Sequence, residues 1–421
     1  MKTNKIRHIA LLLAAVVCMP LASCGKKDGQ TVQAADLTAD IKPQTVSGTD
    51  ADDTFCLGQT AFALKLMQQA VKDDSGNVLI SPYSVMEALA MTANGADGET
   101  LKQMEQTLGG LPIDTLNSYL YTQRMNQPNE KNCKLVDANS LWIKDKDNAI
   151  TVEPDFLQTN MNYYGAGAFK EPFDQNTVKK INQWCSDHTD KMIPELLSGI
   201  DDTVVMYLIN AVLFDAQWAD PYLDEPLDRD FTAQNGDVQT AKMMYSSETR
   251  YLSDSHATGF VKPYSGGKYA FAALLPEEGM TVQDYIAGLT PESLRDTLEN
   301  QQYGDVRAGL PEFTYDYDTT LSDALSEMGM QQAFDSSADF SRMGKTQTGY
   351  LYISEVLHKT HIQVDVNGTK AAAVTAVAMD SCAAPAEEEP KYVILDRPFL
   401  YMILDTETNL PVFIGTLTEI P

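Results

Sequence analysis

The chain has 421 residues and 43% of them are hydrophobic, which is enough for one large core or two smaller ones. Its 59 acidic and 31 basic residues give a formal net charge of -28 at pH 7. This charge argues against a nucleic-acid partner, because nucleic-acid binding needs a basic face. It is typical of a solvated surface that keeps a secreted protein soluble.

The N-terminus has the pattern of a secretory signal peptide. Basic residues precede a short apolar run at residues 9–17, and small residues follow it. The Leu-Ala-Ser-Cys at residues 21–24 resembles a bacterial lipobox. That resemblance implies a lipoprotein signal peptide over residues 1–23 and diacylation of Cys24, which would hold the chain to a membrane surface. The alternative is an ordinary signal peptide that is cut near the same place.

Residues 24–52 are polar and lack apolar periodicity, which predicts a flexible tether between the lipidated Cys24 and a folded domain at residues 53–421. The domain begins with helical periodicity at residues 55–72. A short strand follows at residues 78–80, and a second helix is expected to start at Ser81.

The middle of the chain alternates strands with helices. The two long apolar runs at residues 135–143 and 204–214 are typical of strands that are covered on both faces. A helix is expected between them at residues 177–197. Beyond Asp230 the chain has mostly strand patterns. These elements predict an α+β fold, with helices early and antiparallel strands late.

Motifs of catalysis are missing from the sequence. We find no GxSxG, no HExxH and no glycine-rich phosphate loop. The cysteines that remain after the signal peptide and Cys24 have no metal-ligand spacing. His358 and His361 are three residues apart in a strand pattern and would point to opposite faces, which favours a buried structural histidine over a metal site. We expect no enzyme activity, no metal and no cofactor.

Six segments of the predicted domain carry patterns in a distinctive order: NVLISPYS (77–84), LVDANSLWI (135–143), INQWCSDHTDKMIPELL (181–197), LINAVLFDAQW (208–218), LPEFTYDYDTTLSDALSEMGMQQAFDSSADFS (310–341) and VILDRPFLYMI (393–403). Together they resemble the serpins, a family of serine-protease inhibitors. The resemblance implies about nine helices around three mainly antiparallel β-sheets, with an exposed reactive-centre loop at about residues 368–393.

The resemblance also implies roles for single residues. Ser81, Ser84, Asn210 and His358 fall where the family has its shutter, a polar cluster under the central sheet. Trp218 falls at the breach, the top of the sheet where it first opens.

The segment at residues 367–390 falls where serpins carry the reactive-centre loop. A protease attacks this loop and forms an acyl-enzyme, and the cut loop then inserts as an extra strand into the central sheet. An inserting strand needs a proline-free stretch with uncharged inward side chains. The face that begins with Thr369 and continues through Ala371, Ala373 and Thr375 carries no charge, whereas Lys370 lies on the other face.

The resemblance places the hinge at Gly368, Thr369, Lys370, Ala371, Ala372, Ala373, Val374 and Thr375. We expect Gly368 to supply the conformational freedom that the hinge needs. Two features depart from the family. Val366 stands where a glutamate is usual, so an ion pair near the breach is expected to be absent. The segment up to Pro398 is also about five residues longer than in a typical member.

Family spacing puts the scissile bond at Cys382–Ala383, within a range from Met379 to Ala384. These residues are small or apolar, which favours elastase-like serine proteases or permissive cysteine proteases over trypsin-like enzymes. The expected partners are a protease in covalent complex and, through Cys24, a membrane; the protein is expected to be a monomer that can form loop-sheet polymers. As a bacterial lipoprotein it would belong to the cell envelope, at the outer membrane or the cell surface. The alternative is a non-inhibitory surface lipoprotein with the same fold, acting in ligand binding or adhesion.

Overall fold

The computed structural model describes residues 36–145, 150–189, 191, 193–347, 350–369 and 389–421. All of them belong to one unit, residues 34–421. In this described part of the chain, no helix is long and apolar enough to cross a membrane.

Nine α-helices and a short 3-10 helix lie in the described residues. They are α1 (Asp53–Asp73), α2 (Pro82–Ala93), α3 (Gly98–Thr107), α4 (Ile113–Met125), α5 (Pro154–Tyr164), α6 (Gln175–His188), α7 (Val282–Gly288), α8 (Pro291–Glu299), α9 (Ser322–Glu327) and η1 (Gln332–Phe334). The expected number of helices is confirmed.

The central sheet has seven strands, in the order β12-β14-β15-β6-β3-β2, with β5 paired to β3. Its strands are β2 (Asn129–Glu130), β3 (Cys133–Lys144), β5 (Gly167–Glu171), β6 (Met206–Gln217), β12 (Phe313–Thr320), β14 (Glu355–Asp365) and β15 (Gly368–Thr369). The pairs β3–β5 and β6–β14 are parallel, and the other pairs in this sheet are antiparallel.

A second sheet of nine strands has the order β1-β18-β17-β10-β9-β8-β11-β16, with β7 paired to β8. Its strands are β1 (Val78–Ile80), β7 (Leu227–Thr232), β8 (Val238–Ser253), β9 (Ala257–Pro263), β10 (Tyr269–Pro276), β11 (Gln302–Pro311), β16 (Lys391–Ile394), β17 (Phe399–Asp405) and β18 (Pro411–Leu417). The third sheet consists of β4 (Ile150–Val152) and β13 (Gly344–Thr346). The expected α+β fold with three mainly antiparallel sheets is confirmed.

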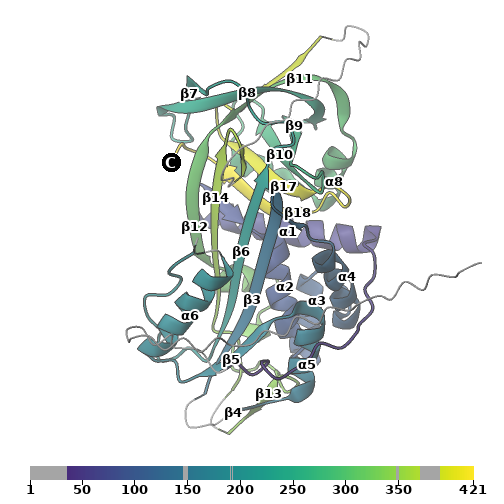
Figure 1. The fold of residues 1–421 in the computed structure, drawn as a ribbon, viewed down its shortest axis with the longest axis vertical. Helices are drawn as coiled ribbons and strands as arrows, with labels where there is room; N and C mark the ends of the chain where they lie inside the picture. The colour runs from purple at the N-terminus through teal and green to yellow at the C-terminus, as the bar shows by residue number, and fades with distance from the viewer. Residues whose placement is uncertain (1–35, 146–149, 190, 192, 348–349, 370–388) are drawn as a thin grey trace, which may run out of the picture. The chain divides into compact units, whose positions relative to one another are not determined.

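The central sheet is covered on both faces, as the apolar runs predicted. Along β6, Tyr207 and Ile209 join a small hydrophobic cluster with Ile181 and Cys185 of α6, whereas Leu208 belongs to the large core. Figure 1 shows α6 lying across one face of this sheet. Because neighbouring strand residues point to opposite faces, two hydrophobic layers require a strand that is apolar at nearly every position.

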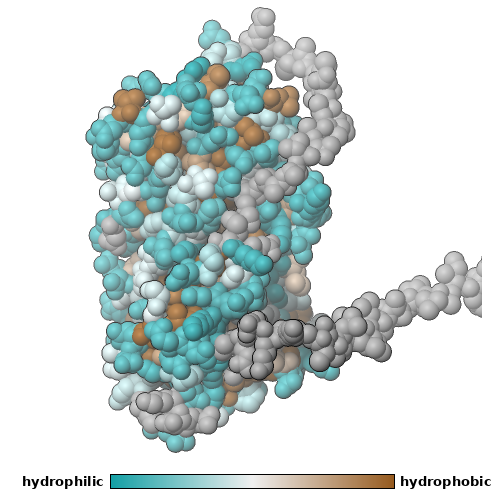
Figure 2. Space-filling model, turned by 60° about the vertical axis from the view of Figure 1, so that its left-hand side comes forward, coloured by the Kyte–Doolittle hydropathy of each residue, from teal (hydrophilic) through white to brown (hydrophobic). Residues whose placement is uncertain are grey.

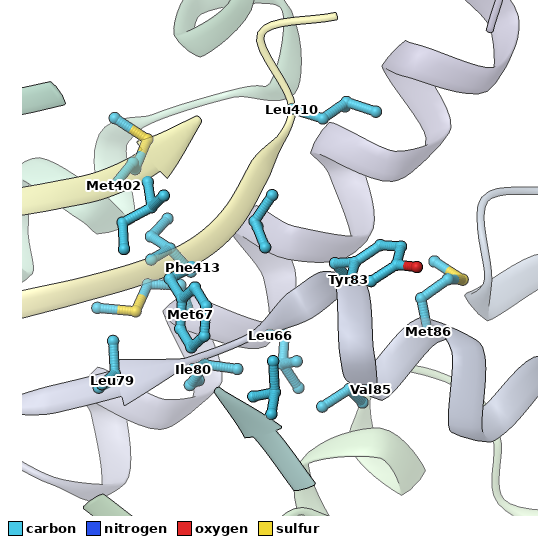
Figure 3. Packing of buried hydrophobic residues seen from close by; sticks show 14 of the residues in the cluster. Leu66, Met67, Leu79, Ile80, Tyr83, Val85, Met86, Met402, Leu410 and Phe413 are labelled. Atoms are coloured by element: carbon cyan, nitrogen blue, oxygen red, sulfur yellow. The ribbon is translucent and has the colours of Figure 1, made fainter. Parts of the chain in front are cut away.

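The large core lies where α1 and α2 meet β1, β17 and β18. Leu66 and Met67 of α1 pack beside Leu79 of β1 and Phe413 of β18 in this region (Figure 3). All of these side chains are at most 2% exposed. Burial of each large apolar side chain contributes roughly 1.5–3 kcal/mol, so this packing stabilises the contact between the two helices and the second sheet.

The helix that contains the Ser-Pro pair begins where the sequence predicts. Ser81 caps α2, because its hydroxyl oxygen accepts a hydrogen bond from the Ser84 amide, and Pro82 occupies the first turn. A capping hydroxyl of this kind contributes about 1 kcal/mol, and proline in the first turn costs no hydrogen bond.

The helix expected at residues 177–197 is shorter than predicted. It runs from Gln175 and ends at His188. Lys191 has a φ of 68°, which no right-handed helix accommodates, and Pro194 follows it. Residues 193–197 are not helical. The side chains of Ile193 and Leu197 nevertheless belong to the small hydrophobic cluster with α6.

The predicted flexible tether does not extend to residue 52. From Asp36 onward the chain lies against the domain: the Leu37 amide donates to the Ala168 carbonyl at 2.8 Å, and the Thr49 amide to the Ser118 carbonyl at 3.0 Å. Leu37 and Ile41 pack against the large core. Isolated apolar residues in a polar segment have no periodicity, so the sequence pattern did not reveal this packed strap, residues 36–52.

The visible surface agrees with the acidic composition. Figure 2 shows hydrophilic residues over most of one face, with hydrophobic residues scattered among them. Scattered surface apolar residues are normal in monomeric proteins and need no partner.

Candidate loop-insertion site

The central sheet contains a slot between β6 and β14. At one end the two strands pair directly, with Glu355–Lys359 opposite Tyr207–Ala211. At the other end β15 separates them and pairs with both, through Thr369 opposite Val364 and Ala216. Among the described residues, no pairing joins residues 360–363 of β14 to residues 212–215 of β6. The slot is therefore roughly 13 Å long at the usual strand rise.

The predicted shutter residues meet at the lower end of this slot, where β6 and β14 pair directly. The Ser81 amide donates to His358 Nε2 at 3.1 Å, and the Ser81 hydroxyl donates to the Val412 carbonyl at 2.8 Å. Across the sheet, Asn139 lies opposite Asn210, and Asn210 lies opposite His358. Of Asn210, the structure describes the backbone. This row of polar residues lies one pair before the place where direct β6–β14 pairing ends.

His358 is buried and neutral. Burial lowers the pKa of its imidazole from 6.5 to about 3. Nε2 accepts a hydrogen bond from Ser81, so in the neutral ring the proton is on Nδ1. His361 points away, and its Nδ1 lies 2.7 Å from Asp316 Oδ1. The pair does not form a metal site, and among the described residues no group of three or more His, Cys, Asp or Glu side chains could hold a metal ion.

The predicted breach residue lies at the upper end of the slot, where β15 separates β6 from β14 and leads into the predicted loop. Trp218 donates from its indole N–H to the Asp365 carbonyl at 2.9 Å and stacks on Tyr264 at 4.6 Å. The Tyr264 hydroxyl shares a hydrogen bond with the Thr369 hydroxyl. Thr369 is 2% exposed. The Thr369 side chain therefore points toward the core.

Gly368 has a structural role in addition to the one expected. It does not adopt a positive φ. A Cβ at this position would lie 2.1 Å from the Ala216 carbonyl oxygen and 2.8 Å from the Gln217 Cα. Glycine is therefore required by the close approach of β15 to β6. The hinge role of Gly368 stays a prediction.

Comparison with known proteins shows the family to which a chain with this fold belongs. The family model described as Serpin (serine protease inhibitor) matches residues 57–420. The chain belongs to the serpin family. Among curated serpins, leukocyte elastase inhibitor A of Mus musculus is 32% identical over 379 residues, which cover 85% of this chain and 97% of that protein.

Two solved serpin structures are similar in fold. The thermophilic serpin tengpin in its native state has a TM-score of 0.87 and 46% identity, and the match covers 92% of this chain and 100% of that one. Tengpin in its latent state has a TM-score of 0.78 and 42% identity, with 89% and 100% covered. The higher similarity is thus to the native state.

The predicted shutter also contains a buried acid that the sequence patterns missed. Glu87 of α2 is 1% exposed, accepts a hydrogen bond from the Tyr83 hydroxyl, and accepts another from the Asn139 side chain at 3.2 Å. Asn139 belongs to the same row of residues as His358. The available signal was a single carboxylate in a helix that has no other charged residue. Because every position of this helix is buried, the carboxylate must find hydrogen-bond donors.

Beside the predicted breach residue Trp218 lies a buried ion pair that the sequence patterns also missed. Lys262 Nζ lies 2.8 Å from Glu248 Oε1, and the two side chains are 2% and 7% exposed. The ammonium group also lies 5.6 Å from the Trp218 ring centroid and 4.5 Å from that of Tyr222. This cation–π contact helps to fix the Trp218 ring, whose indole N–H donates to the Asp365 carbonyl just before β15. A lone lysine in the apolar strand β9 was the signal.

The structure describes the surroundings of Val366, which stands where the family usually has a glutamate. Val366 packs against the large core instead of forming an ion pair. Asp365 and Glu312 lie beside it, and burial, followed by repulsion from Asp365, raises the pKa of Glu312. Two carboxylates therefore flank the turn that leads into β15.

The other predicted site residues lie outside the described part of the chain. These are Cys24, the hinge residues from Lys370 to Thr375, and the scissile region from Met379 to Ala384 with Cys382 and Ala383. Their roles stay predictions. Cys56, Cys133 and Cys185 are described, and each is a buried free thiol.

Proposed function

We propose that this serpin is a suicide inhibitor of serine endopeptidases, and that it traps the acyl-enzyme by inserting its cleaved loop between β6 and β14. The observation that supports this proposal most directly is the slot: two central strands are already separated at the upper end by β15, which leads into the predicted loop.

The register of β15 supports the proposed path of insertion. Thr369 lies opposite Val364, so a strand that continues this register places residue 373 opposite residue 360, where the slot ends. Thr375 would then lie between His358 and Asn210, and insertion beyond Ala373 requires the direct β6–β14 pairs to part, starting with Lys359 and Ala211. The residues of this stretch that would face the core are alanine and threonine, which are small and uncharged.

We propose elastase-like serine proteases as targets, with cleavage at Cys382–Ala383. Small apolar residues fit a shallow specificity pocket, whereas a trypsin-like pocket needs a basic residue. The similarity to leukocyte elastase inhibitor A agrees with this choice. Cysteine proteases with permissive pockets form a second class of target.

The test is to mix the protein with elastase-like, trypsin-like and papain-like enzymes and to look for a complex that survives SDS. We expect such a complex with the elastase-like enzyme, and a released C-terminal fragment whose mass identifies the cut bond. Cleavage by every class without a complex would contradict inhibition and favour the non-inhibitory ligand-binding or adhesion protein.

We also propose that diacylation of Cys24 anchors this serpin in a bacterial cell envelope, at the outer membrane or the cell surface. The lipobox-like residues 21–24 support this proposal. Radiolabelled palmitate should label the wild-type protein in bacteria and should not label a Cys24→Ser variant. Equal labelling of both would contradict it.

A further inference from the structure

The turn between β14 and β15, residues 365–368, has two of its amide groups bound by one carboxylate. Asp365 Oδ1 accepts a hydrogen bond from the Asn367 amide at 2.7 Å and from the Gly368 amide at 3.3 Å. Two successive N–H groups of the turn therefore have a charged acceptor, which forms stronger hydrogen bonds than a neutral one.

The carbonyl groups of the same turn are bound from the other side. The Trp218 indole N–H donates to the Asp365 carbonyl at 2.9 Å, and the Trp218 amide donates to the Asn367 carbonyl at 2.9 Å. The Tyr222 amide donates to the Val366 carbonyl at 3.2 Å. The turn is thus fixed on both sides before any protease has acted.

We propose that Asp365 is a positioning residue of the inhibitory reaction, because it holds a preformed β-hairpin from which the cleaved loop inserts. This inference rests on the proposed function. The first residues of a hairpin are the costly ones to order, since the turn must close before ladder hydrogen bonds form. Here the Asp365–Gly368 and Val364–Thr369 pairs already exist, so each later residue extends an existing ladder.

The speed of insertion decides the outcome of the reaction. After cleavage the acyl-enzyme has two fates: water hydrolyses the ester and frees an active protease, or the loop inserts first and traps it. A preformed hairpin favours insertion. Loss of the Asp365 carboxylate should therefore raise the number of inhibitor molecules consumed per protease inactivated, while the rate of loop cleavage stays unchanged.

The experiment compares Asp365→Ala with Asp365→Asn, which keeps an oxygen acceptor. The matched control is Asp74→Ala, because Asp74 Oδ1 caps the Gly76 amide at 2.8 Å in a similar but remote turn. We expect the ratio of cleaved inhibitor to trapped protease to rise roughly fivefold in Asp365→Ala, the equivalent of one lost capping hydrogen bond, to rise by less in Asp365→Asn, and to stay near wild type in the control.

Three results would overturn the inference: an unchanged ratio in Asp365→Ala, an equal rise in Asp365→Asn, or an equal rise in the control. Wild-type protein that forms no covalent complex would instead contradict the proposed function. If Asp365→Ala does not fold, hydrogen exchange of the wild-type protein decides the matter. The Asn367 and Gly368 amides should exchange as slowly as those of β14; exchange as fast as at the Gly76 amide would overturn the preformed hairpin.

Discussion

At the scale of one residue, Thr369 carries the proposal about which face of the loop enters the sheet. Its side chain is buried, and its hydroxyl meets that of Tyr264. A charge at this position would lie among apolar rings, which costs several kcal/mol.

We predict that Thr369→Arg converts the inhibitor into a substrate. The arginine should keep the start of the loop out of the slot, so SDS gels should show cleaved protein in place of the covalent complex. Thr314→Arg is the matched control, because Thr314 is exposed on β12 of the same sheet and should leave inhibition intact. Normal inhibition by Thr369→Arg would mean that the other face inserts.

His358 makes folding sensitive to acid. The folded protein keeps the imidazole neutral down to a pKa of about 3, whereas the unfolded chain takes up a proton near 6.5. Between these two values the unfolded state binds more protons, so stability is lost as the pH falls.

We predict that this residue alone removes about 1 kcal/mol of unfolding free energy between about pH 7.5 and about pH 5.5. His358→Gln, whose amide can still accept from Ser81, should lose correspondingly less stability over that range in urea titrations. His361→Gln serves as the control, since His361 lies on the other face. A His358→Gln variant with the same acid sensitivity as wild type would contradict the assignment.

At the scale of elements, the strap at residues 36–52 belongs to the folded domain. Its backbone bonds to β5 and α4, and the Gln44 amide donates to the Asn162 side chain of α5 at 2.7 Å. The strap therefore joins helices and a strand that are distant along the chain.

A chain that begins at Asp52 should unfold at a temperature roughly 2–5 °C lower than one that begins at Asp36, because it loses the packing of Leu37 and Ile41. The Asp36 chain keeps every contact described here and is the control for removing the N-terminus as such. Equal melting temperatures in calorimetry would show that the strap contributes nothing to stability.

At the scale of the whole molecule, the proposed insertion predicts a native state that is not the most stable one. A strand that fills the slot and parts the remaining β6–β14 pairs would gain backbone hydrogen bonds on both sides. On this proposal, we expect a kinetic barrier to keep the uncut protein in its native state.

Cleavage within residues 379–384 should raise the melting temperature by roughly 20 °C, as a central strand adds many hydrogen bonds of about 1 kcal/mol each. The same cleavage of Thr369→Arg should leave it nearly unchanged. An unchanged melting temperature after cleavage of the wild-type protein would favour the non-inhibitory alternative.

The sequence by itself determined the fold class and the family. The signals were local patterns: apolar runs such as residues 204–214, the Ser-Pro start of α2, and six motifs in order. Local patterns can be recognised without knowledge of tertiary contacts. The same patterns predicted the residues at both ends of the slot. They failed where a signal was a single residue, as with the isolated apolar residues of the strap.

Only the tertiary structure decided which partners those residues have. Ser81 and His358 are 277 positions apart, yet they share a hydrogen bond. The structure also showed that the close approach of β6 requires Gly368, and that Asp365 binds the amides of its own turn. These facts depend on distances between strands that come together through the whole fold, and no periodicity along the chain encodes such distances.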